Sequence, residues 1–213
     1  MKEKTNCNGK TRSKLILCIL FTAVITVGFK TICSRFNKPV SVGNELRTTA
    51  VLPHDSNSFT EGLFFYQNQL YESSGLYEKS YLFMKETPDS ADILKKTDML
   101  SEVFAEGIVV FDNMLYVLTW QENKAYQINP DTLEILSELP YSREGCGLTT
   151  DGEYLIASDG TDEIFFMDSN LQTLKSIHVT ESGISIDNLN ELEYIDGFLY
   201  ANIWQTNDIA VID

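Results

Sequence analysis

Short apolar runs broken by polar turns recur four times along the chain. In residues 104–120, F-A-E-G-I-V-V-F-D-N-M-L-Y-V-L-T-W, Glu106-Gly107 opens one run, Asp112-Asn113 marks a turn, and a second run ends at Trp120. Equivalent stretches cover residues 59–75, 144–160 and 189–204. The leucines after the turns, Leu70, Leu115, Leu155 and Leu199, are separated by 45, 40 and 44 residues. This period, built from short strands and tight turns, predicts a β-propeller with one blade per repeat.

Each repeat predicts several strands and no helix. The second repeat predicts strands over 107–111, 115–120, 125–128 and 133–139, and the third over 147–150, 154–158, 163–167 and 174–179. Turn dipeptides at 112, 151 and 196 separate apolar runs, as in β-hairpins. No long stretch has a helical period, so we expect an all-β fold.

The fourth repeat predicts strands over 192–195, 199–204 and 209–212, after which the sequence ends. Two interpretations fit. The β-prone run from Thr48 to Leu52 could supply the missing outer strand and close a four-bladed ring. Alternatively, about one blade is absent and the ring is open. Periodicity does not choose between them.

Charge is distributed unevenly. Residues 1–38 carry eight Lys and Arg against one Glu, whereas the remaining residues carry eight against thirty Asp and Glu, a net charge of −22. A strongly acidic body repels phosphate backbones, which argues against nucleic acid as a partner.

The N-terminal residues have the pattern of an export signal. Basic residues precede an apolar run over 15–29, which Lys30 closes. Fifteen residues is short of the roughly 20 of a typical bilayer span. We expect a signal peptide or signal anchor over 1–33, a polar linker over 34–46 and the propeller over 47–213. An uncleaved anchor, a cleaved signal and a lipoprotein all fit, and each places the body in the periplasm or another extracytoplasmic space.

Carboxylates and indoles recur at the expected mouth of the ring. We place Glu61, Glu106, Cys146 and Glu191 just before each first strand, and Gly75, Trp120, Gly160 and Trp204 at the end of each second strand. A carboxyl group against aromatic walls could act as a general acid or base. Turn formation on a solvated rim and packing between blades are the structural alternatives. We expect Glu193 to point away from Glu191.

The sequence suggests no cofactor and no metal site. His54 and His178 are isolated and lack metal-ligand spacing. A nucleophile elbow, a P-loop and a dinucleotide fingerprint are absent from the sequence. Three of the four cysteines lie in or beside the N-terminal apolar stretch, so no disulfide framework is predicted.

Several motifs, in order and at matching spacing, resemble the plant-type and bacterial glutamine cyclotransferases. They are P-H-D-x-x-x-F-T-E-G-L (53–63), L-Y-E-S-S-G-L-Y (70–77), F-A-E-G-I (104–108), G-L-T-T-D-G (147–152), S-D-G-T (158–161) and L-N-E-L-E-Y-I-D-G-x-L-Y-A-N-I-W-Q-T (189–206). The resemblance implies a five-bladed propeller, here with four recognisable repeats. It also implies an enzyme that converts N-terminal glutamine of peptides to pyroglutamate, releasing ammonia without a catalytic zinc.

The resemblance also assigns residue roles. It implies that Glu106 and Asn190 are catalytic, and that the substrate-binding residues are Phe59, Glu61, Trp120, Glu191 and Trp204. The chain departs from the family at Cys146, where tryptophan is usual. It also ends before the family's last blade, which supplies a lysine, so impaired activity is expected.

The expected protein is a monomeric, membrane-tethered or exported cyclotransferase for peptides with N-terminal glutamine. A non-catalytic extracytoplasmic propeller that binds a ligand is the alternative from another class. A calcium-dependent propeller hydrolase such as a lactonase is a third, and it requires several oxygen ligands converging on the axis.

Overall fold

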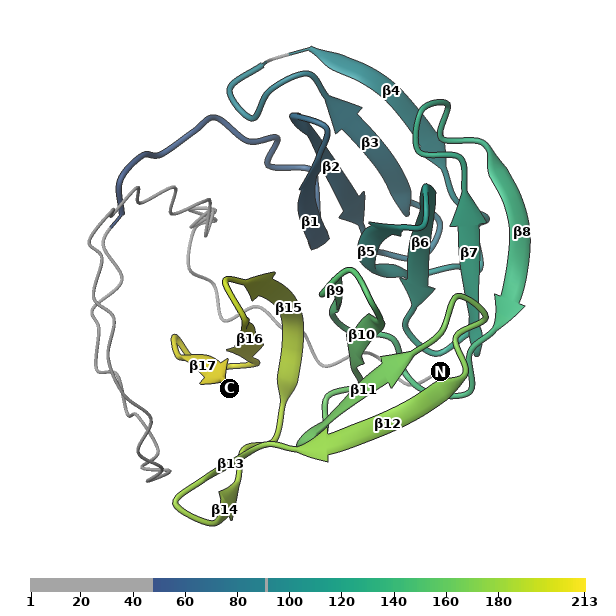
Figure 1. Cartoon of the computed structure of the whole chain (residues 1–213). Helices are drawn as coiled ribbons and strands as arrows, with labels where there is room; N and C mark the ends of the chain where they lie inside the picture. Colours follow the sequence, from purple (N-terminus) through teal and green to yellow (C-terminus); the bar gives the residue numbers. More distant parts are fainter. Residues whose placement is uncertain (1–47, 91) are drawn as a thin grey trace.

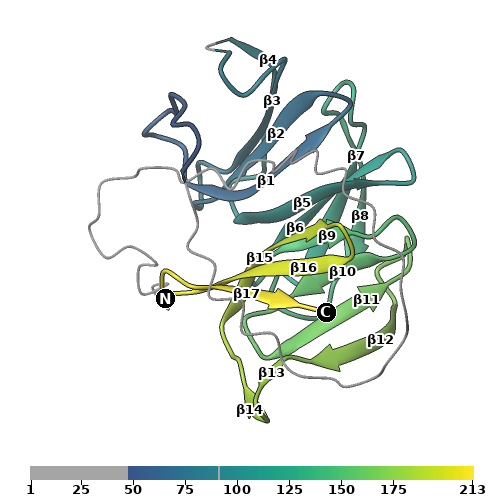
Figure 2. The same ribbon diagram turned by 60° about the vertical axis from the view of Figure 1, so that its left-hand side comes forward.

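The structure, a computed structural model, describes residues 48–90 and 92–213. Its strands form four antiparallel sheets that follow one another around a common axis (Figure 1). The same succession of sheets is seen from the side in Figure 2. No helix occurs among these residues. The prediction of an all-β propeller with one blade per repeat is therefore confirmed.

Three blades have four strands and the fourth has three. Blade 1 consists of β1 (Thr60–Tyr66), β2 (Gln69–Ser74), β3 (Tyr81–Lys85) and β4 (Ile93–Asp98). Blade 2 consists of β5 (Ala105–Phe111), β6 (Met114–Thr119), β7 (Lys124–Ile128) and β8 (Ile135–Pro140). Blade 3 consists of β9 (Leu148–Thr150), β10 (Leu155–Ser158), β11 (Glu163–Met167) and β12 (Thr173–His178). Blade 4 consists of β15 (Leu189–Ile195), β16 (Phe198–Ile203) and β17 (Ile209–Ile212), and a short hairpin of β13 (Thr180–Glu181) and β14 (Ile184–Ser185) precedes it.

The predicted strands match these bounds to within three residues at each end, but one of the two interpretations, closure of a four-bladed ring by residues 48–52, is not supported. Residues 48–52 form no strand, so they do not complete blade 4. The sector between β17 and β1 contains no strand of the described residues (Figure 1). The β13–β14 hairpin was not predicted, because the period of the repeat has no place for it.

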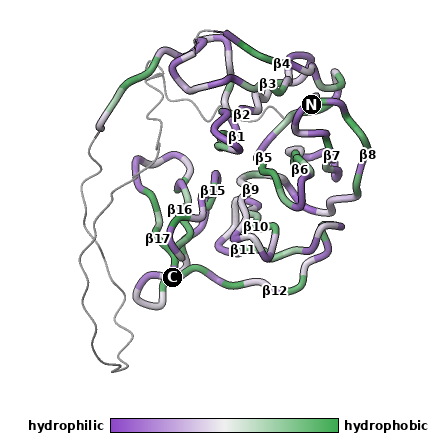
Figure 3. Tube along the Cα trace, turned by 45° about the horizontal axis from the view of Figure 1, so that its top comes forward, coloured by the Kyte–Doolittle hydropathy of each residue, from purple (hydrophilic) through white to green (hydrophobic). Residues whose placement is uncertain are grey.

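Apolar side chains fill the space between successive blades. One buried cluster joins blades 1 and 2 and includes Leu82 and Val117. A second joins blades 2 and 3 and includes Leu118 and Leu155, and a third joins blades 3 and 4 and includes Ile156. Hydrophobic and hydrophilic segments accordingly alternate along the trace of every blade (Figure 3). Burial of these side chains is the main force that holds the blades together.

Near the axis, the inner strands approach too closely for side chains. A Cβ atom on Gly62 would lie 2.8 Å from the backbone nitrogen of Ile108 in the next blade. A Cβ atom on Gly107 would lie 2.5 Å from the backbone nitrogen of Leu148, and one on Gly147 would overlap the carbonyl oxygen of Asn190. The short distance between the strands permits a backbone hydrogen bond between blades, in which the Gly107 N–H donates to the Cys146 carbonyl at 2.8 Å.

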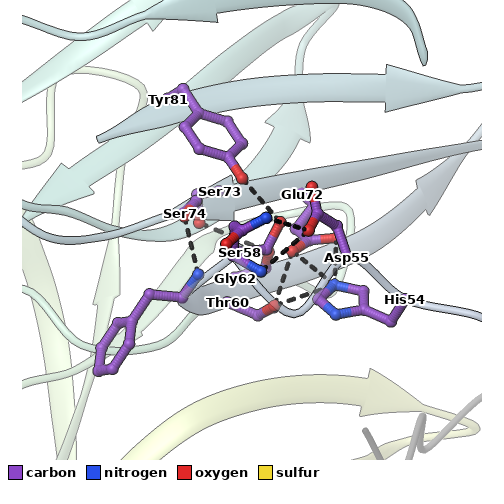
Figure 4. A network of polar contacts seen from close by, with 11 residues as sticks. His54, Asp55, Ser58, Thr60, Gly62, Glu72, Ser73, Ser74 and Tyr81 are labelled. Atoms are coloured by element: carbon purple, nitrogen blue, oxygen red, sulfur yellow. Dashed lines mark hydrogen bonds and ion pairs between the residues drawn. The ribbon is translucent and has the colours of Figure 1, made fainter. Parts of the chain in front are cut away.

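The segment that leads into blade 1 is held by a buried carboxylate (Figure 4). Glu72 on β2 is fully buried, and both of its oxygens contact His54 Nε2, at 2.9 and 3.1 Å. Thr60 Oγ1 also donates to Glu72 Oε1 at 2.6 Å. The burial of Glu72 is therefore offset by several polar contacts, one of which involves His54.

The expected signal or anchor over 1–33, its apolar run over 15–29 and the linker over 34–46 lie outside the described residues. Across 48–90 and 92–213, the structure contains no helix of the length and apolarity needed to cross a bilayer.

The glycines at the axis generate the first prediction. We expect Gly147→Ala to lower the free energy of unfolding by about 1–3 kcal/mol, because the added methyl group must push blades 3 and 4 apart. Urea unfolding followed by circular dichroism measures the change. Lys95→Ala, on the exposed strand β4, is the control. Equal midpoints for the two variants would show that the close approach is not a constraint on stability.

Candidate functional site

Bulges in the inner strands create the site at one mouth of the ring. The pairing register shifts between Thr60 and Gly62 in β1, between Ala105 and Ile108 in β5, and between Leu189 and Leu192 in β15. The residues skipped by the ladder include Glu61, Glu106, Asn190 and Glu191. Bulges of this kind redirect side chains and often lie next to active sites. Since every blade is an antiparallel meander of the same order, these bulges lie at the same end of the ring.

The structure corrects the alignment of the fourth repeat by one residue. Ser73 Oγ on blade 1 donates to the carbonyl of Glu106 on blade 2 at 2.6 Å. The corresponding Ser158 Oγ on blade 3 donates to the carbonyl of Asn190 on blade 4 at 2.5 Å. Asn190, and not Glu191, is therefore the equivalent of Glu106. The placement of Glu191 in the series Glu61, Glu106, Cys146 was wrong, because the position was counted one residue too close to Leu199.

Glu191 instead takes the position held by an axial glycine in the other blades. Its side chain extends toward blade 1, where the Leu63 backbone N–H donates a hydrogen bond to it. Burial raises the pKa of Glu191 well above its usual range, and the nearby carboxylates of Glu193, Glu106 and Glu61 raise it further. The hydrogen bond from Leu63 acts in the opposite direction. The structure thus brings Glu61, Glu106 and Glu191 together, and we call them the carboxylate cluster.

Glu193 belongs beside this cluster, contrary to the sequence expectation. It raises the pKa of Glu191, so the two carboxyl groups lie close together. Residues two apart on a strand share a face, and the expectation that Glu193 points away misapplied that period. Burial raises the pKa of Glu193 to about 7.

An aromatic cluster flanks Glu106 on blades 1 and 2. Phe104, which is buried on the same bulged segment, lies at its centre. Phe59, Tyr77 and Trp120 pack against Phe104 with ring centroids 6.1, 5.6 and 5.7 Å away, all edge to face. Gly75 allows this packing, because a Cβ atom there would overlap the Phe104 ring. Phe59, Glu106 and Trp120 are therefore brought together as predicted.

Two further carboxylates bind the polar atoms of the aromatic cluster. Tyr77 donates its hydroxyl to Glu122 Oε1 at 2.7 Å, and Trp120 donates Nε1–H to Glu144 Oε2 at 3.1 Å. Burial raises the pKa of Tyr77, and Glu122, Glu106 and Glu144 add to the shift. The same shift shows that Tyr77 lies within electrostatic range of Glu106.

Trp204 in blade 4 is the equivalent of Trp120, whereas Cys146 in blade 3 is the equivalent of Glu106. Trp204 follows β16, and its backbone N–H donates to the Asn188 carbonyl at 2.8 Å. Its indole Nε1 is buried and has no hydrogen-bond partner within the described part of the chain. Cys146 is half-buried between Gly145 and Gly147 at the entry to β9.

No group of three or more His, Cys, Asp or Glu side chains in residues 48–90 and 92–213 has an arrangement that could hold a metal ion. His178 Nδ1 lies 3.3 Å from Asp162 Oδ1 on blade 3. The calcium-dependent hydrolase therefore gains no support from the described residues.

Comparison with known proteins identifies the family. The family model described as glutamine cyclotransferase matches residues 21–213. The chain belongs to the glutamine cyclotransferase family. A curated glutaminyl-peptide cyclotransferase from Arabidopsis thaliana is 34% identical over 173 residues, which cover 79% of this chain and 53% of that protein. This chain thus matches about half the length of the plant protein.

Solved structures agree with this assignment. The glutaminyl cyclase of Myxococcus xanthus matches with a TM-score of 0.70 and 32% identity, covering 76% of this chain and 68% of that chain. A protein of unknown function from Bacteroides caccae matches with a TM-score of 0.54 and 12% identity, covering 75% of this chain and 60% of the other, and shares the fold alone.

Several residues of the site in this glutamine cyclotransferase were not predicted from its sequence. Phe104 was detectable, because the pattern aromatic-x-Glu-Gly occurs at both 59–62 and 104–107. Tyr77, Glu122 and Glu144 carried no comparable signal. They come from connecting segments, whose position in space is set by the packing of different blades.

The raised pKa of Glu193 predicts how stability depends on pH. A carboxyl group with a higher pKa in the folded state binds more protons there, so stability falls as pH rises from about 4.5 to about 7. We expect Glu193→Gln to weaken this fall and to be more stable than wild type at pH 8, by roughly 1–3 kcal/mol. Urea midpoints at pH 5 and pH 8 test this, with the exposed Glu181→Gln as control. An identical pH dependence in Glu193→Gln and wild type would contradict it.

Proposed function

We propose that this chain is a glutaminyl-peptide cyclotransferase that acts on peptides with N-terminal glutamine. Family membership and the names of its relatives in Arabidopsis and Myxococcus support this activity. The structural observation that carries the proposal is a buried carboxyl group, Glu106, between an aromatic cluster and further carboxyl groups at one mouth of the ring.

The reaction requires a folded conformation of the substrate and a group that relays a proton. The neutral α-amine of the substrate attacks its own side-chain amide carbon, a carbon–nitrogen bond forms, and the bond to the amide nitrogen breaks. The attacking nitrogen loses a proton and the leaving nitrogen gains one, so that ammonia departs. Glu106 accepts the first proton and returns it to the leaving group, which is general base and general acid catalysis by one residue.

Aromatic side chains impose the folded shape of the substrate. The extended glutamine side chain must curl back on the α-amine, and restricting it to that geometry contributes through proximity and orientation. Trp120 and Phe104 offer rigid apolar surface beside Glu106. The buried Trp204 Nε1 is a donor suited to a substrate carbonyl, and the Asn190 side chain orients the amide or the amine.

Glu191 and Glu61 complete the electrostatics. Glu191 lies among three other carboxyl groups, and its raised pKa favours the protonated form, which limits repulsion within the carboxylate cluster. Glu61 adds negative charge that attracts the substrate's ammonium group before it loses its proton.

The decisive experiment measures ammonia released from a glutamine-initiated dipeptide. We expect Glu106→Gln to reduce kcat/KM by about 10²- to 10⁴-fold, since the amide cannot relay a proton. Glu102→Gln, an exposed carboxylate four residues away, should match wild type. Absence of turnover by wild type, or equal turnover by Glu106→Gln, would refute the role given to Glu106.

The buried Trp204 Nε1, which has no hydrogen-bond partner within the described residues, also suits one alternative, a propeller that binds such peptides without turning them over. In that case the dipeptide raises the melting temperature of wild type, and no ammonia appears. Trp204→Phe should weaken this stabilisation, because the indole N–H is removed.

We further propose that the propeller works outside the cytoplasm, held or exported by residues 1–33. The basic residues before the apolar run over 15–29 support this orientation. Alkaline phosphatase fused after Asp213 should be active in a bacterial host, and deletion of residues 15–29 should abolish that activity. An active fusion in the deletion variant would contradict export by this segment.

A further inference from the structure

Trp120 is held through its backbone and through contacts of its ring. Its backbone N–H donates to the Phe104 carbonyl at 3.1 Å, and its ring packs edge to face on Phe104. The indole is 9% exposed. The terminal torsion of a tryptophan side chain has broad, roughly two-fold preferences, so stacking alone leaves two ring orientations. A directional contact is needed to select one of them.

Glu144, on the segment between β8 and β9, supplies that contact. Its Oε2 accepts the Trp120 Nε1–H bond at 3.1 Å, and its Oε1 accepts a bond from Gln121 Nε2 at 2.8 Å. Both carboxylate oxygens are therefore committed to adjacent residues of one segment. A hydrogen bond to an ionised acceptor is stronger than one between neutral groups.

The backbone next to Glu144 is itself fixed to the end of β6. The Gly145 N–H donates to the carbonyls of Thr119 and Trp120, each at 3.0 Å. A Cβ atom on Gly145 would lie 2.5 Å from the Thr119 carbonyl oxygen, so the two segments are in close backbone contact. The carboxylate is consequently placed relative to the same segment that carries the indole.

We propose that Glu144 is a positioning residue that selects the orientation of the Trp120 indole in the aromatic cluster beside Glu106. Its effect on turnover rests on the proposed cyclotransferase activity, whereas its effect on the indole does not. Glu144 is exposed on its outer side, so its removal leaves the buried contacts between blades intact.

Two readouts test the proposal. The sequence contains two tryptophans, so Trp204→Phe leaves Trp120 as the single indole chromophore. In that background we expect Glu144→Ala to lose about half or more of the near-ultraviolet circular dichroism of Trp120, because two ring orientations become populated. Glu144→Gln keeps an acceptor oxygen and should retain most of the signal. Glu134→Ala, an exposed carboxylate in a turn, is the control.

Turnover is measured with Trp204 intact. We expect Glu144→Ala to lower kcat/KM for a glutamine-initiated dipeptide by about 10- to 100-fold, mainly through kcat, with Glu144→Gln restoring most of it. Thermal unfolding verifies that each variant is folded.

An unchanged Trp120 signal in Glu144→Ala overturns the proposal. A changed signal with undiminished turnover overturns its functional half. If wild type releases no ammonia, the cyclotransferase proposal fails, and the dichroism measurement alone decides whether Glu144 orients the indole.

Discussion

The close approach of backbone to backbone around the axis determines the rest of this structure. Gly62, Gly107 and Gly147 each face the next blade at a distance where a side chain would overlap main-chain atoms. Glycine is required there for its missing Cβ and not for an unusual torsion. Once the inner strands lie this close, the residue before each glycine must turn away from the neighbouring blade. The bulged residues therefore project into the mouth of the ring, where the chemistry is placed.

The same constraint explains the unusual place of Glu191. In blade 4 the position that is glycine in the other blades carries a side chain, and no described blade follows it. A Cβ atom on Gly62 would lie against the backbone nitrogen of Ile108 in the next blade. The Glu191 side chain approaches the equivalent backbone nitrogen of blade 1, that of Leu63. A hydrogen bond from Leu63 thus takes the place of a backbone contact, and it links blades 4 and 1 near the axis.

Periodicity was sufficient to predict the blades and their strands, because strand length and turn residues are local properties. It also gave Glu61, Glu106 and Trp120 fixed positions in their repeats, whereas Phe59 was assigned from the family resemblance. The error at Glu191 was a miscount and not a failure of the period. Asn190 lies as far before Leu199 as Glu106 lies before Leu115, and both strands have the same register shift. Residues 48–52 have the composition of a strand. A strand pairs only where the free edge of another strand lies close by, and local sequence does not show whether one does.

Contacts between blades were beyond sequence reasoning for a different reason. Glu144 reaches Trp120 across 24 positions, and Tyr77 reaches Glu122 across 45. Neither separation is a multiple of a strand or helix period, so each pair depends on how two rigid sheets are rotated about the axis. Site residues on the inner strands are thus fixed by the repeat, whereas those that orient them come from the connections. The blade pattern can therefore preserve the reacting groups of a family, while the connecting segments determine how tightly the orientation of those side chains is fixed.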